Sequence, residues 1–182
     1  MKHKNKICFE INYRKSIEVI LYILSKYEKQ GLSLCNLLKM IFAADKYHLN
    51  QYASPVTGDT YIKMKYGTVP SEIKNILDKN QSTLDFIADI IIEYPFERLT
   101  SKHHLKGTRQ YNENLLSESD IEALEFGIKE YDGLTFEEVK NKNHSEKCWK
   151  ESILDSSIDF ELIIENNEIL TYLKEVSAGM VV

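Results

Sequence analysis

The amino-acid sequence predicts a mainly α-helical (α+β) fold, a compact multi-helix domain with a small antiparallel β insert. Apolar residues recur every three or four positions through most of the chain, as they do on amphipathic helices. A short stretch near residue 60 instead alternates apolar and polar residues, as half-buried strands do. With 182 residues, of which 43% are hydrophobic, we expect residues 1–182 to form a single domain. Its core should span about 14–153, with an acidic C-terminal helix over 158–176 as an appendage.

Two helices are expected to open the fold. The first spans residues 14–29, where apolar residues share one face, and Gly31 is a favourable stop signal after it. Ser33 is the expected N-cap of the second helix, which continues to about residue 52. Because only residues 30–32 separate them, the two helices must pack side by side or at a sharp angle.

The chain is then expected to leave helical structure. Pro, Gly and turn-forming residues over 54–59 predict a loop, and residues 60–66 predict a strand. This strand has two faces, with Ile62, Met64 and Tyr66 on the inner one and Tyr61, Lys63 and Lys65 on the one expected to be exposed. Gly67 is expected to end the strand, and Pro70 to open a third helix. A second strand over 98–109 is expected to pair with the first.

Further helices are expected in the second half of the chain. Residues 85–94 fit either a helix or a strand, and we favour a helix. Ser117, with Asp120 in the first turn, marks the start of another helix. Thr135 opens a capping box that predicts a short helix after it. A last amphipathic helix is expected over 160–176.

Charge is distributed unevenly along the chain. Residues 1–116 have a formal charge of +5 and residues 117–182 a charge of −10, which together give the net charge of −5. The acidic final third would repel nucleic-acid phosphates and could present an acidic face to a basic partner. The simpler explanation, which we favour, is that these acids solvate amphipathic helices. We expect no nucleic-acid partner.

The sequence also indicates where the protein resides. No apolar run approaches the length of a membrane span, and no apolar signal-peptide segment follows the basic residues 1–6. Cys8, Cys35 and Cys148 are far apart and odd in number, which indicates buried thiols in a reducing cytosol. We therefore expect a soluble, cytoplasmic protein with no membrane partner.

Motifs for phosphate binding, dinucleotide binding and nucleophilic catalysis are absent from the sequence. Asp45 and His48 lie one helical turn apart and could ligate a metal ion if Asp59 or His144 supplied a third ligand. The alternative, which we favour, is a hydrogen-bonded polar cluster that fixes the loop over 55–59. We therefore expect no catalytic residue, no metal, no cofactor and no enzymatic activity.

Tyrosines and lysines gather between residues 46 and 66. Such a mixture suits either single-stranded nucleic acid or a protein interface. The acidic net charge and the lack of an Arg-rich patch favour the protein interface.

Several longer motifs occur in order along the chain. They are KMIFAADKYHLNQYASPVTGDTY over 39–61, MKYGTVPS over 64–71, LSESD over 116–120 and YDGLT over 131–135, followed by His144 and Trp149. Together they resemble the Panacea domain, also called the SocA-like antitoxin domain, from about residue 17 to residue 149. Ala53 after Tyr52, and Thr68 after Gly67, are mild departures from the Tyr-Gly and Gly-Pro-Val-Pro that are usual in that family.

The resemblance implies an antitoxin of a type II toxin–antitoxin pair, associated with phages or mobile elements. Such an antitoxin neutralises a co-encoded toxin by direct binding and performs no catalysis. The partner is then the product of the adjacent gene, and a homo-oligomer is left open. The motif positions expected to maintain the fold are Asp45, His48, Gly58, Tyr66, Gly67, Pro70, His144 and Trp149. The residues expected to contact the partner are Pro55, Thr57, Asp59, Tyr61, Lys63 and Lys65, with the acidic C-terminal helix as a second arm.

Three alternatives remain open from the sequence. The chain could be a proteolytic adaptor that delivers a toxin to an energy-dependent protease, with the apolar end at residues 178–182 as a docking tail. It could be a DNA-binding regulator that uses the helix over 33–52 for recognition. It could also be a metal hydrolase built on Asp45 and His48.

Overall fold

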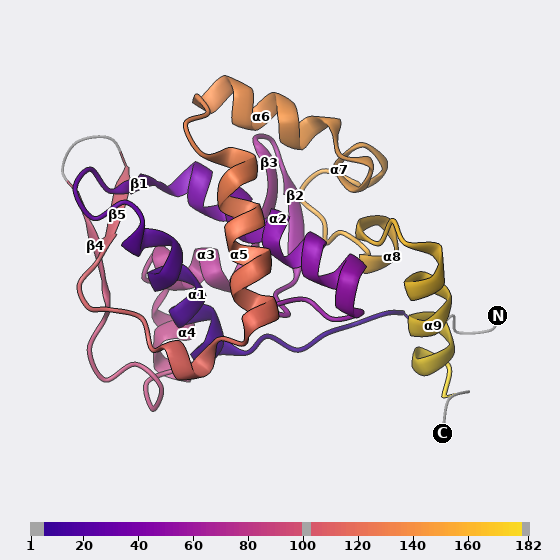
Figure 1. The fold of residues 1–182 in the computed structure, drawn as a ribbon, viewed down its shortest axis with the longest axis horizontal. Helices are drawn as coiled ribbons and strands as arrows, with labels where there is room; N and C mark the ends of the chain where they lie inside the picture. Colours follow the sequence, from indigo (N-terminus) through magenta and orange to yellow (C-terminus); the bar gives the residue numbers. More distant parts are fainter. Residues whose placement is uncertain (1–5, 100–102, 180–182) are drawn as a thin grey trace.

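One long helix, α2 (Leu34–Tyr52), runs through the middle of the molecule (Figure 1). The computed structural model describes residues 6–99 and 103–179. In the foreground of Figure 1, α5 (Glu118–Tyr131) lies across α2, and α1 (Tyr13–Ser25) also packs against it. The predicted mainly α-helical fold with a small antiparallel β part is confirmed.

Shorter elements surround this centre. The other helices are α3 (Ser71–Leu77), α4 (Gln81–Phe86), α6 (Phe136–Ser145), α7 (Lys147–Glu151), α8 (Phe160–Ile163), α9 (Asn167–Ser177) and a 3-10 turn at Glu113–Leu115. The strands are β1 (Leu32–Ser33), β2 (Tyr61–Met64), β3 (Gly67–Pro70), β4 (Phe96–Arg98) and β5 (His104–Gly107). In Figure 1, α6 and α7 lie at the top, α8 and α9 at the right, and β1, β4 and β5 at the left.

The predicted helix starts are confirmed by hydrogen bonds. The Ser33 hydroxyl accepts a backbone N–H of the first turn at 3.1 Å and caps α2. Ser117 and Asp120 form a reciprocal capping box at the start of α5. Thr135 and Glu138 form another at the start of α6. These local contacts involve residues three apart in sequence, which is why the sequence alone predicts them.

The close approach of α2 and α5 depends on one glycine. A Cβ atom added to Gly127 would lie 2.3 Å from the carbonyl oxygen of Met40. Ala123 and Leu124 on α5 and Ala44 on α2 are buried in the same apolar core. Small residues at the crossing let the two backbones approach, so that the larger apolar side chains around them pack without voids.

Strand pairing differs from the prediction. β2 pairs with β3 in a hairpin that turns at Lys65 and Tyr66, so Gly67 begins a strand instead of ending one. β5 pairs with β1 and β4. The expected pairing of 60–66 with 98–109 is therefore wrong, and residues 100–102 lie outside the described part. A hairpin between neighbouring segments closes a much shorter loop, which costs less chain entropy than the long connection that we expected.

The predicted single helix over 160–176 is divided into α8 and α9. The side-chain oxygen of Asn50, on α2, accepts the backbone N–H of Glu165 at 2.6 Å and that of Asn166 at 2.9 Å. Asn166 also caps α9. The Asn50 side chain thus binds the backbone between α8 and α9, where the predicted helix is interrupted. No sequence pattern near residue 165 indicates this contact. The division of the chain into a core and a C-terminal appendage stays a prediction.

Two other helices are shorter than predicted. α1 ends at Ser25, and turns lead from it to Gly31, which has a φ of +67°. The helix favoured over 85–94 is present only at its start, because α4 ends at Phe86. Turns follow, and Ile92 is 99% exposed, so this apolar stretch is not held against the core along its length.

The thiols are not uniformly buried. Cys148 is buried, Cys35 is half-buried and Cys8 is exposed. The expectation of three buried thiols is therefore wrong for Cys8, which lies in the extended segment before α1.

Two sequence features extend beyond the described residues. The basic start includes residues 1–5, and the apolar end includes residues 180–182. Among the helices of residues 6–99 and 103–179, none has the length and apolar composition that crossing a lipid bilayer requires.

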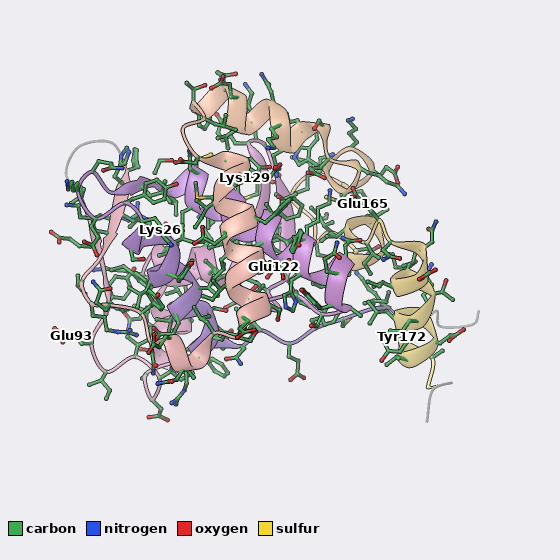
Figure 2. All side chains as sticks on the ribbon, viewed as in Figure 1. Lys26, Glu93, Glu122, Lys129, Glu165 and Tyr172 are labelled. Atoms are coloured by element: carbon green, nitrogen blue, oxygen red, sulfur yellow. The ribbon has the colours of Figure 1, made fainter. Side chains whose placement is uncertain are left out.

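Replacing Gly127 with alanine should destabilise the protein, although the same change in an unconstrained helix is stabilising. The new methyl group would collide with the Met40 carbonyl, and overpacking of this kind costs about 2 kcal/mol. Urea unfolding measures the loss. The control is Lys129→Ala on the exposed side of α5 (Figure 2), which should change the free energy of unfolding little. An unchanged or raised stability of Gly127→Ala would contradict the tight crossing of α2 and α5.

Candidate functional site

A buried carboxyl group on α2 organises the loop that follows this helix. Asp45 is 2% exposed, and its Oδ1 accepts the backbone N–H of Thr57 at 2.9 Å. Its Oδ2 accepts the hydroxyl of Tyr61 at 2.8 Å and also the hydroxyl of Thr57. Burial raises the pKa of Asp45, and these hydrogen bonds oppose the rise. These hydrogen bonds join α2 to the loop over 55–59 and to the strand after it.

The same loop holds the start of α3. The Asp59 carboxyl accepts the backbone N–H of Glu72 at 3.1 Å and that of Ile73 at 2.8 Å. Burial raises the pKa of Asp59 to about 6, and the two backbone hydrogen bonds oppose this rise. Gly58 has a φ of +75°, and a Cβ atom there would lie 2.3 Å from the carbonyl oxygen of Glu10. Only glycine fits this position.

Three of the residues expected to contact a partner are interior. Thr57, Asp59 and Tyr61 are at most 1% exposed, so the expectation of an exposed surface is wrong for them. The Tyr61 ring packs edge-on against Phe42, with 5.2 Å between the centroids, and its hydroxyl reaches Asp45. An alternating pattern predicts which residues share a face of a strand. It does not show which face the rest of the chain covers.

His144 and Trp149 hold the β2–β3 hairpin from outside. The Trp149 indole N–H donates to the carbonyl of Met64 at 3.1 Å, and His144 Nε2 lies 3.1 Å from the carbonyl oxygen of Lys65. The two rings stack with 3.7 Å between their centroids. Burial lowers the pKa of His144, which favours the neutral imidazole. Both side chains therefore contact the backbone of the hairpin, at Met64 and Lys65.

The other residues expected to contact a partner differ in exposure. The Lys63 amine lies over the Trp149 ring, 4.3 Å from its centroid, and donates to the carbonyl of Ser152 at 2.8 Å. Lys63 and Pro55 are half-buried, whereas Lys65 is exposed. Of the six predicted contact residues, Lys65 thus presents the most open side chain.

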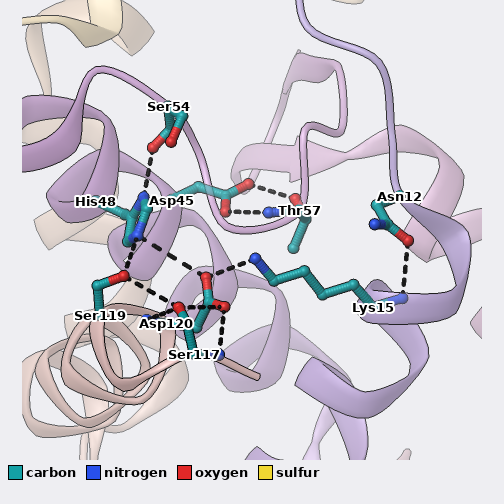
Figure 3. A network of polar contacts seen from close by, with 9 residues as sticks. All are labelled: Asn12, Lys15, Asp45, His48, Ser54, Thr57, Ser117, Ser119 and Asp120. Carbon is teal, nitrogen blue, oxygen red and sulfur yellow. Dashed lines mark hydrogen bonds and ion pairs between the residues drawn. The ribbon is translucent and has the colours of Figure 1, made fainter. Parts of the chain in front are cut away.

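His48 links the end of α2 to the start of α5 (Figure 3). Its Nδ1 lies 2.5 Å from the carbonyl oxygen of Ser54, and its Nε2 lies 3.1 Å from the hydroxyl of Ser119. Beside it, Asp120 pairs with the Lys15 amine at 2.6 Å. Burial would raise the pKa of Asp120, but hydrogen bonds, led by that of Lys15, lower it overall. Sequence reasoning missed Lys15 and Ser119, because these partners come from distant segments.

The candidate metal ligands are occupied by hydrogen bonds within the protein. His48 contacts Ser54 and Ser119 through its two nitrogens, while Asp45 binds Thr57 and Tyr61. Among residues 6–99 and 103–179, no three His, Cys, Asp or Glu side chains form a group that could hold a metal ion.

The tyrosines between residues 46 and 66 do not form one surface. Tyr47 and Tyr52, near the end of α2, both donate to Glu122 on α5, at 2.6 and 2.7 Å. Tyr61 is buried, whereas Tyr66 lies at the tip of the hairpin and is 48% exposed. The predicted aromatic and basic surface is thus divided among three places.

A large apolar hollow lies next to Tyr66. It has a volume of about 840 Å³ and lies between the first turns of α2, the hairpin and the connection from α5 to α6. We call it the hairpin groove and define it by its apolar walls, which are Leu34, Leu38, Met64, Val69, Leu134 and Phe136. Among the predicted contact residues, Lys65 lines it.

Lys39 also lines the hairpin groove, although it is only 2% exposed. Its amine donates to the carbonyl oxygen of Thr68 on β3. Burial lowers the pKa of Lys39 to about 8. Sequence reasoning did not single out Lys39, but the signal was present, since this lysine interrupts an apolar run between Leu37 and Phe42.

Behind Lys39, a buried amide holds β3 to α6. The Asn143 side chain accepts the backbone N–H of Thr68 at 2.6 Å and donates to the Thr68 hydroxyl at 3.0 Å. Gly67 leaves the space for this contact, because a Cβ atom there would lie 2.3 Å from the Asn143 Oδ1. These contacts therefore fix β3, whose Val69 lines the groove, against α6.

Comparison with protein families shows which family the chain belongs to. The model of the SocA-like antitoxin, Panacea domain, matches residues 37–150, which is more than half of the chain. The protein belongs to this family. The Panacea match begins within α2 and ends in α7, so it includes the Asp45 cluster, the hairpin and most of the hairpin groove. It starts later than residue 17, where the motif resemblance began, and α1, α8 and α9 lie outside it.

Two other comparisons add nothing to the Panacea assignment. No curated protein matches the chain, and no solved structure matches it.

Removing the Tyr61 hydroxyl with Tyr61→Phe should lower the free energy of unfolding by about 2 kcal/mol, the size expected for a buried hydrogen bond to a carboxylate. Urea unfolding measures this loss. Tyr66→Phe is the matched control, because its side chain is exposed at the hairpin tip, and it should change stability little. Equal stabilities of the two variants would show that the bond to Asp45 contributes nothing.

Asp59 should make the stability depend on pH. Its pKa is about 6 in the folded protein and near 3.8 in the unfolded chain, so the folded state retains a proton that the unfolded state has released. The free energy of unfolding should therefore fall as the pH rises from about 4 to about 6, by about 3 kcal/mol. Asp59→Asn removes this titration, so wild type should lose stability relative to the variant over this interval. Urea unfolding at several pH values tests it, and a pH-independent difference would contradict the raised pKa.

Proposed function

We propose that this protein is an antitoxin that neutralises a toxin protein by binding it directly. The observation on which the proposal depends is the match of residues 37–150 to the SocA-like antitoxin family. In this proposal the toxin is the product of the adjacent gene, the two proteins meet in the cytoplasm, and the antitoxin transforms no substrate of its own.

A preformed binding surface supports this proposal. The Asp45 cluster, the Asp59 contacts with α3 and the Asn143 contacts with β3 are buried hydrogen bonds that fix the hairpin against α2 and α6. A surface that is already ordered loses less conformational entropy when it binds. Stable inhibitory complexes bury roughly 1,600 Å² in total, so the hairpin groove would be one part of a larger contact.

The DNA-binding alternative is less compatible with the position of α2. A recognition helix must present its side chains to the major groove. The middle of α2, from Leu37 to Asp45, is instead buried between α1, α5 and β3. The acidic residues of α5, such as Glu122 in Figure 2, also oppose approach to phosphates.

Expression of the adjacent gene's product alone should arrest growth, and co-expression of this chain should restore it. The two proteins should also co-purify at a fixed ratio. An unrelated protein expressed at the same level is the control and should neither restore growth nor co-purify. Failure of both the rescue and the co-purification would overturn the proposed function.

The half-life of the toxin separates direct inhibition from delivery to a protease. Under direct inhibition, the toxin should be degraded no faster in the presence of this protein than in its absence. A pulse-chase experiment measures this rate. Faster degradation of the toxin, together with rescue, would favour the proteolytic adaptor.

A further inference from the structure

The hairpin groove has the shape and chemistry of a docking site for a segment of a partner. Its walls are aliphatic and aromatic side chains from α2, the hairpin and the start of α6. At its rim, the exposed rings of Tyr66 and Phe136 meet edge-on with 5.3 Å between their centroids. Tyr66 is 48% exposed and Phe136 is 46% exposed. Large aromatic side chains beside a hollow are the usual anchors of protein interfaces.

A buried cation in this groove lacks a counter-charge. The Lys39 ammonium can donate three hydrogen bonds, and the carbonyl of Thr68 accepts one of them. Within residues 6–99 and 103–179, no carboxylate forms an ion pair with Lys39. Burial of an unpaired ammonium destabilises the charged form, so a partner that brings a carboxylate would gain a strong interaction here.

The other charges around the groove are close to balanced. Lys65 is exposed, and Lys74 already forms an ion pair at the end of α3. Two acids, Asp132 and Asp155, also line the groove, and both are exposed to solvent. Lys39 therefore differs from these four charged side chains, because it is buried and has no ion-pair partner among the described residues. Its charge is complementary to an acidic ligand.

We propose that the hairpin groove binds an apolar segment of the toxin that carries an Asp or Glu side chain, and that this carboxylate pairs with the Lys39 amine. The inference rests on the proposed function, because the occupant is the toxin. Tyr66 and Phe136 would pack on the apolar residues of the segment, while Lys39 would select the carboxylate. A carboxylate that enters the groove becomes largely desolvated, which makes its pairing with Lys39 specific as well as strong.

The test measures the Kd between purified full-length protein and purified toxin. Lys39→Met keeps an unbranched apolar side chain of similar size and removes the charge, and it should weaken binding at least about 30-fold. Phe136→Ala should weaken binding at least about 10-fold. Two controls lie outside the groove. They are Lys150→Met on α7 and Phe86→Ala on α4, whose side chain is more exposed than that of Phe136, and both should bind like wild type.

Folding of each variant is checked by circular dichroism and urea unfolding. If Lys39→Met does not fold, Lys39→Gln replaces it, because glutamine still offers a donor to the Thr68 carbonyl but has no charge. A double-mutant cycle then identifies the carboxylate. In the toxin, each candidate Asp is replaced by Asn and each Glu by Gln, one at a time. One of these toxin variants should bind the wild-type protein more weakly than the unchanged toxin does. The same variant should bind Lys39→Met about as well as the unchanged toxin does, because the pairing is already lost.

Each outcome is decisive. If wild type binds the toxin and both groove variants bind equally well, the groove is not the docking site, although the proposed function stands. If Phe136→Ala weakens binding and the Lys39 variants do not, the proposed pairing with a carboxylate is wrong. If wild type neither binds nor rescues, the proposed function itself fails. If the groove variants instead dissociate an oligomer of this chain in sedimentation, the occupant is a second copy and the proposal is overturned.

Discussion

The buried carboxyl of Asp45 is the contact on which the arrangement of the molecule depends. It lies in the interior half of α2 and accepts hydrogen bonds from Thr57 and Tyr61, which belong to the loop and strand that follow. A carboxyl group this deeply buried is unfavourable unless donors surround it. The loop must therefore fold back over α2, and this places β2 and β3 against the helix. The contact thereby helps to position the hairpin and, at its tip, the Tyr66 side of the groove.

Polar residues on α2 therefore serve two different purposes. Asp45 and His48 are satisfied by donors and acceptors of the chain itself, and they join α2 to the loop after it and to α5. Lys39 lies two turns earlier, on a wall of the hairpin groove, and has a single carbonyl partner among the described residues. A buried polar group that is fully satisfied stabilises a fold, whereas one that is incompletely satisfied is available to a ligand. This difference separates the structural motif from the surface that we assign to the toxin.

Local patterns predicted the helix starts better than the helix ends, and the capping contacts show why. Ser33, Ser117 and Thr135 each accept a backbone N–H group from three residues further along the chain. Their capping role can therefore be predicted from a short stretch of sequence. The strand pairs were predicted less well, because the alternation of apolar and polar residues within 60–66 does not show which other segment pairs with this strand. The break near residue 165 depends on Asn50, more than one hundred positions away, and no local pattern could reveal it.

The candidate site shows the same division. The sequence alone indicated the family, which the family comparison shows, and it led to the expectation of a protein partner, because both follow from the order and type of neighbouring residues. Only the tertiary structure showed that Tyr61 points inward, that Lys39 lines a groove, and that Phe136 and Tyr66 meet at its rim. Exposure is a property of what the rest of the chain covers. It is decided by the packing of segments that are distant in sequence, which no single stretch of residues contains.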